Sequence, residues 1–459
     1  MTALQDDLFE PADDVPLDEF RAALAGADRI YLKKLSLNDW QWSDNPKAHQ
    51  GGPYIPHADR DAGFFPALTA MERAAGEPPI LEAWFDIIWP QNGGEIKRAR
   101  LVNYRSKGEE THLTNVVKEP FQRISPASLL LITRKKPDAG PRQYTALIAD
   151  SASAPYDYLR DLFRFDTDFV SGFFDPGRAE ADAGQRVLTF LEQALDAWRK
   201  GTLQEFAKGH ATVPGTTDMA AMAQSQYLKA QGLSSLDPFS MDAPGDAVMQ
   251  ISRDIEYRLF QDFEMKMRSM QLIGIILGLD SGKMTVERAL RSLISDFALV
   301  DKVLLSAAQQ RKSRAGKSFE LHIERLLRDG SVPHEVQVVI ASKKRPDFVL
   351  PSYRMYMDDQ RSNDAALVLS AKTTLRERWK QVHSEIRNCE LYLATVDENV
   401  AASAIVEMGE AGIRLVVPES LKTSDAAVYR RQSNVISFAE FFRTDIGRRR
   451  MPLWNSKIS

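Results

Sequence analysis

The stretch LSAKTTLRERWKQVHSEIRN, residues 369–388, decides how the second half of the chain is interpreted. It opens with the apolar run of a β-strand and ends with the periodic apolar residues of a helix. Between the two lie Lys372 and the triplet Arg376, Glu377 and Arg378, and the helix carries Glu385. A catalytic site next to a recognition helix would need such groups. An ordinary βα unit with a charged outer face would look much the same locally.

The segments on either side of this stretch predict further helices and strands. The order of all these elements is more informative than the stretch alone. Apolar periodicity predicts the order αβββαβαβ, which is typical of an α/β unit around a mixed sheet. It resembles the wiring of the PD-(D/E)XK nuclease core. The expected elements are a helix over 317–329, strands over 335–341, 346–352 and 365–372, a helix over 376–388, a strand over 390–396, a helix over 400–412 and a strand over 413–417.

The first part of the chain has a different pattern. Residues 1–15 are acidic and predict no regular structure, whereas residues 28–175 carry short strand patterns with frequent turns, which favour a barrel-like β domain. The segments DPGRAEADAG (175–184) and GHATVPGTTD (209–218) interrupt these patterns. We therefore expect an N-terminal domain over 1–183, a connection over 184–215 and a C-terminal domain over 216–459. The last begins with two long amphipathic helices, over 246–273 and 285–310, with Thr285 as N-cap of the second.

The overall composition excludes several classes of protein. The formal net charge of −4 gives no hint of nucleic acid, but QRKSRAGK (310–317) holds four cations and no anion. A solvated face is the ordinary alternative for such a cluster. Cys389 is the only cysteine, which excludes a disulfide framework and fits a reducing compartment. The chain has no apolar run of about 18 residues and no signal-peptide pattern, so we expect a cytoplasmic protein.

Carboxylates and one lysine near the strand ends could form a site for divalent metal chemistry. Mg²⁺ prefers carboxylate oxygens and water, and a nearby lysine can stabilise charge on a phosphate. Asp347 begins the second predicted strand and Lys372 ends the third, but Ser370 stands where an acidic partner of the lysine would be expected. Glu385 on the following helix could supply that charge, and Glu320 on the preceding helix is a further carboxylate. Alternatively, Asp347 caps a turn and Glu385 pairs with a surface lysine.

Four motifs in the C-terminal domain carry a resemblance to a known family. RKSRAGKSFELHIERLL (311–327), PDFVLPS (346–352), AKTTLRERWKQ (371–381) and AGIRLVVPESL (411–421) strongly resemble the catalytic domain of EcoRII-like type II restriction endonucleases. The resemblance implies a restriction-endonuclease-like α/β fold, with a mixed sheet flanked by helices and an active site of Glu320, Asp347, Lys372 and Glu385. It further implies that Asp347 and Glu385 hold Mg²⁺.

The same resemblance gives the basic residues a role in binding double-stranded DNA. In relatives that cut sites flanked by CC and GG, a basic-acidic-basic triplet reads those bases. The chemistry fits, because arginine bonds guanine O6 and N7 and glutamate accepts from cytosine N4. The triplet Arg376, Glu377 and Arg378 is therefore expected to recognise bases, although it could also be a solvated helix start. The residues expected to contact the DNA backbone are Arg311, Lys312, Arg314 and Lys317.

The N-terminal domain resembles the same family more faintly. YLKKLSLNDW (31–40) and AHQGGPYIPHADRDAGFFPAL (48–68) look like the start of its effector domain, a B3-like DNA-binding pseudobarrel. His49 and Tyr54 fall where that family contacts effector DNA, and Arg105 lies in NYRSKGEETHLTN (103–115), which is similar to its second recognition loop. The alternative is a β domain that only packs or inhibits.

Together these features predict a homodimeric, Mg²⁺-dependent type II restriction endonuclease that is regulated by a second DNA copy bound to the N-terminal domain. A cytosine methyltransferase is expected as its functional, not physical, partner, because an active nuclease needs host DNA to be protected. The competing interpretation is a DNA-binding regulator with an inactive nuclease core.

Overall fold

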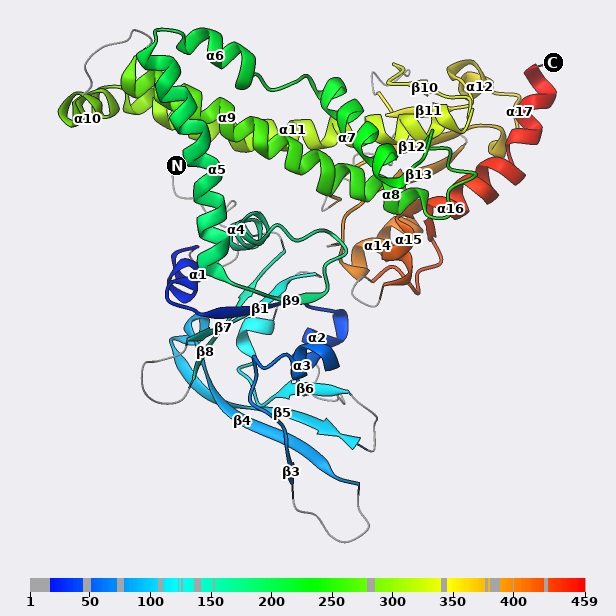
Figure 1. Ribbon diagram of the computed structural model, residues 1–459. Coiled ribbons are helices and arrows are strands. Elements are labelled where there is room, and N and C mark those ends of the chain that lie inside the picture. The colour runs from blue at the N-terminus through cyan, green and yellow to red at the C-terminus, as the bar shows by residue number, and fades with distance from the viewer. Residues whose placement is uncertain are drawn as a thin grey trace, which may run out of the picture. The chain divides into compact units, whose positions relative to one another are not determined.

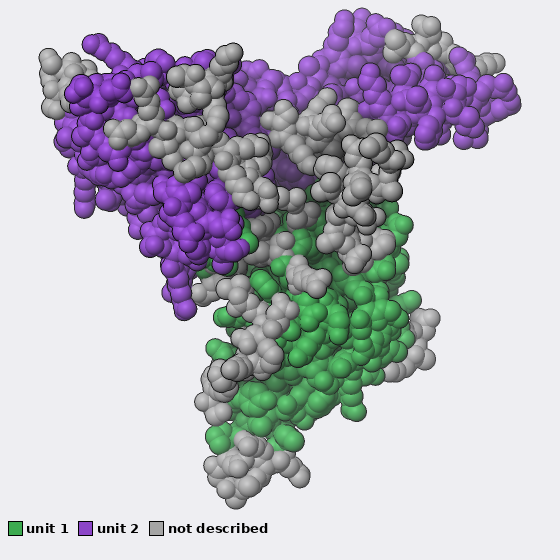
Figure 2. Space-filling view, turned by 180° about the vertical axis from the view of Figure 1, so that it is seen from behind, with its two compact units in different colours: residues 1–183, 398–401, 424–428 green, residues 184–397, 402–423, 429–459 purple. Residues whose placement is uncertain are grey.

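The chain forms two compact units, which are described separately (Figures 1 and 2). Unit 1 consists of residues 1–183, 398–401 and 424–428, and unit 2 of residues 184–397, 402–423 and 429–459. In this computed structural model the described residues are 17–43, 51–71, 78–105, 110–122, 124, 127–135, 142–151, 153–278, 285–339, 345–375, 379, 389–398, 400–424 and 428–458. The expectation for residues 1–15 lies outside them. No helix in these described ranges is long and apolar enough to cross a membrane.

Unit 1 is built on one nine-stranded sheet, in which β3 pairs with β4 beside the path β2-β6-β5-β4-β8-β7-β1-β9. The pairs are antiparallel except for β4 with β8, which run parallel. The prediction of a barrel-like β domain is confirmed, and the short strands β2, β3, β6 and β9 are additions to it. The strands are β1 (Arg29–Lys34), β2 (Tyr54–Ile55), β3 (Thr69–Met71), β4 (Ile80–Trp89), β5 (Glu95–Tyr104), β6 (Thr111–Thr114), β7 (Leu129–Lys135), β8 (Gln143–Ala149) and β9 (Ser171–Phe174).

The sheet of unit 1 is buried on both of its faces at strand β1. Tyr31 belongs to one apolar cluster, with Phe64 and Trp89, while Ile30 and Leu32 belong to a second cluster against the helices. Burial on both sides explains why β1 is apolar at consecutive positions instead of alternating. The helices of this unit are α1 (Leu17–Leu24), α2 (Leu37–Gln41), α3 (His57–Asp61) and α4 (Ala154–Phe163), with short 3-10 turns over Pro90–Asn92 and Glu119–Phe121.

Unit 2 contains a six-stranded mixed sheet in the order β10-β11-β12-β13-β14-β15. The first three strands are antiparallel and the last four run parallel. The predicted α/β fold is confirmed, and β15 is an additional strand. The strands are β10 (Glu335–Val336), β11 (Phe348–Leu350), β12 (Leu367–Ala371), β13 (Glu390–Ala394), β14 (Ile413–Val417) and β15 (Val435–Ser437). Every residue of β12 is buried, as expected of a central strand in a sheet covered on both faces.

Helices flank this sheet (Figure 1). The stretch predicted as one helix over 246–273 is continuous through α8, a π-helical turn over Ile251–Ile255 and α9. The break predicted between 310 and 317 is wrong, because α11 runs through it and the chain breaks at Asp296 instead. Thr285 caps α10, as predicted. The helices are α7 (Thr216–Gln231), α8 (Pro244–Gln250), α9 (Glu256–Leu277), α10 (Val286–Ser295), α11 (Phe297–Asp329), α12 (Tyr353–Met357), α14 (Ala402–Glu410) and α15 (Glu419–Thr423), with a 3-10 turn over Asn363–Ala365.

The segment expected to connect the domains is largely helical. α5 (Pro176–Arg199) begins inside the predicted break, because Pro176 suits the first turn of a helix and the Asp175 side chain accepts the amide of Arg178. α6 (Leu203–His210) follows. Phe190 and Trp198 pack with Met270 and Ile273 of α9 in one apolar cluster. The second half of α5 therefore belongs to the core of unit 2.

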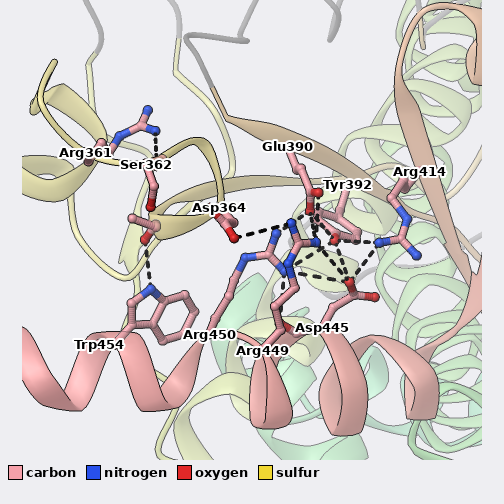
Figure 3. Close-up of polar contacts among 11 residues, drawn as sticks. Arg361, Ser362, Asp364, Glu390, Tyr392, Arg414, Asp445, Arg449, Arg450 and Trp454 are labelled. Atoms are coloured by element: carbon pink, nitrogen blue, oxygen red, sulfur yellow. Dashed lines mark hydrogen bonds and ion pairs between the residues drawn. The ribbon is translucent and has the colours of Figure 1, made fainter.

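The C-terminal segment is tied to the sheet by a dense ion-pair cluster (Figure 3). α16 (Phe438–Glu440), a π-helix over Phe441–Arg448 and α17 (Met451–Ile458) form this segment. Arg450 is fully buried and bonds Glu390 of β13, while Asp445 accepts from Arg414 at 2.8 Å. Burial would raise the pKa of Glu390, but hydrogen bonds from Tyr392 and Arg449 and the charge of Arg450 together lower it. Arg449 and Arg450 of the basic run 448–450 therefore stabilise the fold.

Candidate active site

Asp347 and Lys372 meet where two antiparallel strands of unit 2 overlap. Asp347 directly precedes β11 and Lys372 directly follows β12, and the register that pairs Phe348 with Leu369 puts the start of β11 beside the end of β12. Lys372 Nζ lies 2.7 Å from Asp347 Oδ2, which also accepts the amide of Ala371 at 2.8 Å. Two donors of different origin therefore fix this carboxylate.

The free side of that carboxylate is suited to a divalent cation. The Asp347 and Lys372 side chains keep 11% and 22% of their surface exposed. Among the described residues, no hydrogen-bond donor contacts Asp347 Oδ1, so this hard oxygen is left for a ligand such as Mg²⁺. The residues that the structure describes contain no group of three or more acidic, His or Cys side chains that could hold a metal alone. Glu385, the other predicted metal ligand, lies outside the described residues.

Glu320 is connected to Asp347 through one residue that the sequence did not point to. Gln337 donates its side-chain amide to Glu320 Oε2 at 3.0 Å and its backbone amide to the carbonyl of Asp347 at 3.1 Å. Its φ of 49° lies in the left-handed region, an uncommon conformation for glutamine. Glu320 also accepts from Lys317 at 3.0 Å. The structure thus brings three predicted site residues, Glu320, Asp347 and Lys372, into one connected group.

A buried polar network holds the helix that carries Glu320. His322 and Ser318 of α11 both contact Glu256 of α9, with His322 Nε2 at 2.8 Å from Glu256 Oε2. The Gln224 amide lies 3.0 Å from His322 Nδ1, so Nδ1 accepts and Nε2 donates to the carboxylate. Two residues along a helix correspond to about 200° of rotation, so Glu320 points away from this network. Because the network fixes the rotation of α11, it also fixes the direction of Glu320.

Some of the basic residues of α11 already contact other residues of unit 2. Arg314 donates to the carbonyl of Pro214 at 2.9 Å, and its guanidinium lies 5.0 Å from the Phe260 ring centroid. Lys317 is exposed and pairs with Glu320. The side chains of Arg311 and Lys312 lie outside the described part. The predicted base-reading residues Arg376, Glu377 and Arg378 also lie outside it.

In unit 1, Tyr54 is the predicted effector-DNA contact that takes part in a cluster of described residues. The amide of Tyr54 donates to the buried Asp39 at 2.7 Å, and Asp39 in turn pairs with Lys33 at 2.9 Å. The Tyr54 ring meets His112 of β6 edge-on, with centroids 5.9 Å apart. His112 was not among the predicted residues, although the alternating pattern of THLT could have identified its face. Arg105 is exposed at the end of β5, and His49 lies outside the described residues.

The chain is similar to known proteins in sequence and in structure. The family model described as EcoRII C terminal matches residues 282–442. The chain is 31% identical to the type II restriction enzyme EcoRII of Escherichia coli over 403 residues, 85% of this chain and 88% of that protein. It is 27% identical to the type II restriction enzyme SsoII of Shigella sonnei over 218 residues, 45% of this chain and 69% of that protein. Among solved structures, metal-depleted Ecl18kI in complex with uncleaved, modified DNA is 25% identical, with a TM-score of 0.43, and covers 53% of this chain and 80% of that chain.

Proposed function

The chain belongs to the EcoRII family of type II restriction enzymes and is a site-specific deoxyribonuclease, and from this premise we propose that it cuts double-stranded DNA with Mg²⁺. The observation that carries the proposal is the contact between Asp347 and Lys372, which joins an acidic and a cationic group at one strand end. We further propose that the cut site is short, is flanked by CC and GG, and lies on cytoplasmic DNA.

The residues of this site suit the hydrolysis of a phosphodiester. Asp347 Oδ1 and Glu385 would hold Mg²⁺, which when bound lowers the pKa of coordinated water and offsets charge on the phosphate. Asp347 Oδ2 fixes Lys372, so that its ammonium can donate to a phosphate oxygen or to the attacking water. The amide of Ala371 donates to the same carboxylate oxygen and so helps to fix its orientation. Glu320 adds a further carboxylate, positioned by Gln337.

The site is tested by the metal dependence of cleavage. The purified chain, incubated with a random-site DNA library and Mg²⁺, should produce ends that share one short sequence, because cleavage is site-specific. EDTA should stop the reaction and excess Mg²⁺ should restore it, since the ligand oxygens remain in place. Sequencing of the cut ends reads out both results. A chain that binds one sequence tightly and never cuts it in Mg²⁺ would instead support the competing interpretation, a DNA-binding regulator with an inactive nuclease core.

Cleavage of both strands also bears on assembly. A duplex presents two antiparallel strands related by twofold symmetry, while the described part of each chain carries one such site. We therefore propose a homodimer, the commonest symmetric assembly. A companion cytosine methyltransferase would protect host DNA as a functional partner without binding the enzyme. The basic residues Arg311, Lys312, Arg314 and Lys317 would contact the DNA backbone, with Arg314 having to share its guanidinium with Pro214.

For unit 1 we propose the role of a B3-like effector domain that binds a second copy of the DNA site. Tyr54 with His112, together with Arg105 and His49, would contact that copy. The anchoring of Tyr54 through Asp39 supports this role, because it fixes the backbone that carries an aromatic side chain in contact with His112. Effector and cleavage sites on separate units would be coupled, so binding at one would change activity at the other.

The proposed regulation can be tested with a fragment of the chain. Its first residue is chosen so that α5 keeps its packing within unit 2. The predicted break at 209–218 suggests a fragment that starts at residue 210. That fragment would lack Phe190 and Trp198, which pack against Met270 and Ile273, and the burial of one such side chain stabilises the fold by about 1.5–3 kcal/mol. A fragment over 184–459 keeps this cluster and should fold. We expect it to cut single-site plasmid at least as fast as the whole chain, without added cognate oligonucleotide. A soluble 184–459 fragment that binds the site yet cuts more slowly than the whole chain would contradict inhibition by unit 1.

A further inference from the structure

A buried carboxylate at the end of the neighbouring strand holds the chain between the catalytic lysine and the predicted base-reading triplet. Asp397 Oδ2 accepts the backbone amide of Leu375 at 2.8 Å, and both residues are buried. Three residues earlier, the amide of Lys372 donates to the carbonyl of Ala394, the last residue of β13, at 2.9 Å. The segment 372–375 is therefore attached at both ends to the chain that leaves β13.

Asp397 is itself held firmly. Its amide donates to the Thr395 hydroxyl at 3.0 Å, and its carbonyl accepts the hydroxyl of the fully buried Tyr429. Thr395 is fully buried and donates its amide to Val416 of β14 at 3.0 Å. A carboxylate held by this many fixed neighbours moves little, so Leu375 has one defined position relative to the sheet.

We propose that Asp397 is a positioning residue for base recognition: its bond to Leu375 fixes, relative to Lys372, the backbone that directly precedes the triplet starting at residue 376. This inference rests on the proposed function, in which that triplet reads the outer bases of the site. A base-reading arginine needs its guanidinium within hydrogen-bond distance of two guanine atoms at once, so a small displacement of the preceding backbone weakens discrimination. Asp397 would act through Leu375 and would not touch DNA.

The inference predicts a loss of specificity that a loss of stability alone does not produce. In Asp397→Ala the Leu375 amide has no acceptor, and we expect the ratio of kcat/KM for the cognate site to that for a site with one outer base pair changed to fall about tenfold or more. Asp397→Asn keeps a side-chain oxygen that can accept the amide, and it should retain most of the wild-type ratio. Thr395→Val, which removes the hydroxyl that holds Asp397, should lie between the two.

The matched control is Asp329→Ala. Asp329 Oδ2 accepts the backbone amide of Leu236 at 2.7 Å in the same unit, so its loss removes a bond of the same kind, together with an ion pair to Arg325. Asp329→Ala should lower the Tm by a similar amount and leave the ratio of kcat/KM unchanged. If Asp397→Ala does not fold, Thr395→Val carries the test.

Four outcomes separate the possibilities. A wild-type ratio in Asp397→Ala, or in Thr395→Val where the alanine variant is unfolded, overturns the inference. An Asp397→Asn variant as unspecific as Asp397→Ala also overturns it, because charge and not the amide bond would then be required. An equal loss in Asp329→Ala would assign the effect to stability. If the wild-type chain itself cuts without site preference, the proposed function fails, and this result is recognised before any variant is compared.

Discussion

Asp347→Asn is expected to lower the rate of DNA cleavage by about a hundredfold to a thousandfold or more, the usual cost of removing one stabilising group from an active site. The amide nitrogen cannot accept the Lys372 ammonium and Ala371 amide as Oδ2 does, and the neutral side chain is a poor ligand for Mg²⁺. The measurement is single-turnover cleavage of a cognate oligonucleotide with Mg²⁺. Binding of the same DNA in EDTA should be retained, because Asp347 is not expected to contact bases.

The control for this variant is Asp358→Asn. Asp358 is exposed after α12, and its side chain accepts the local amide of Gln360 at 2.9 Å. It should cut at the wild-type rate. Lys372→Gln should resemble Asp347→Asn in rate, since it leaves Asp347 without its cationic partner and the phosphate without its donor. An Asp347→Asn variant that cuts nearly as fast as the wild type would remove Asp347 from the active site.

The pair Asp347 and Lys372 could be predicted because strand ends carry their own signals. A polar residue that directly begins or ends an apolar run of β residues lies at the edge of the sheet. The order of elements then decides which edges meet, and the antiparallel pairing of β11 with β12 is the one that the predicted wiring requires. Glu320 could be predicted as a further carboxylate on the preceding helix. Its link to Asp347 through Gln337 could not, since no sequence signal marks a glutamine with a φ of 49°.

Sequence signals are ambiguous where polar residues pair with partners far away along the chain. The basic run 448–450 looks like an exposed patch, yet Arg450 is buried against Glu390, 60 residues earlier. Only the fold brings these charges together, and burial of this arginine is tolerated because both terminal nitrogens of its guanidinium have partners, Nη2 at Glu390 and Nη1 at the carbonyl of Asp445. The break expected at 175–184 failed for a local reason. Proline and glycine often interrupt helices, but Pro176 stands in the first helical turn, where it is favoured.

Base discrimination should depend on Arg376 and Arg378, the two cations of the predicted base-reading triplet. Arg376→Ala is expected to cost about 1–3 kcal/mol of discrimination between the cognate site and a site with one outer base pair changed, the worth of a bidentate guanine contact. The measurement is the ratio of kcat/KM on the two oligonucleotides, and Arg354→Ala on the exposed face of α12 is the control. Substitution of Lys317, a predicted backbone contact, should instead weaken binding to all sequences alike and reduce its salt dependence. An Arg376→Ala variant that loses affinity equally for cognate and random DNA would assign Arg376 to the DNA backbone. The bond from Asp397 to Leu375 would then position a phosphate contact, and sequence recognition would have to come from other residues.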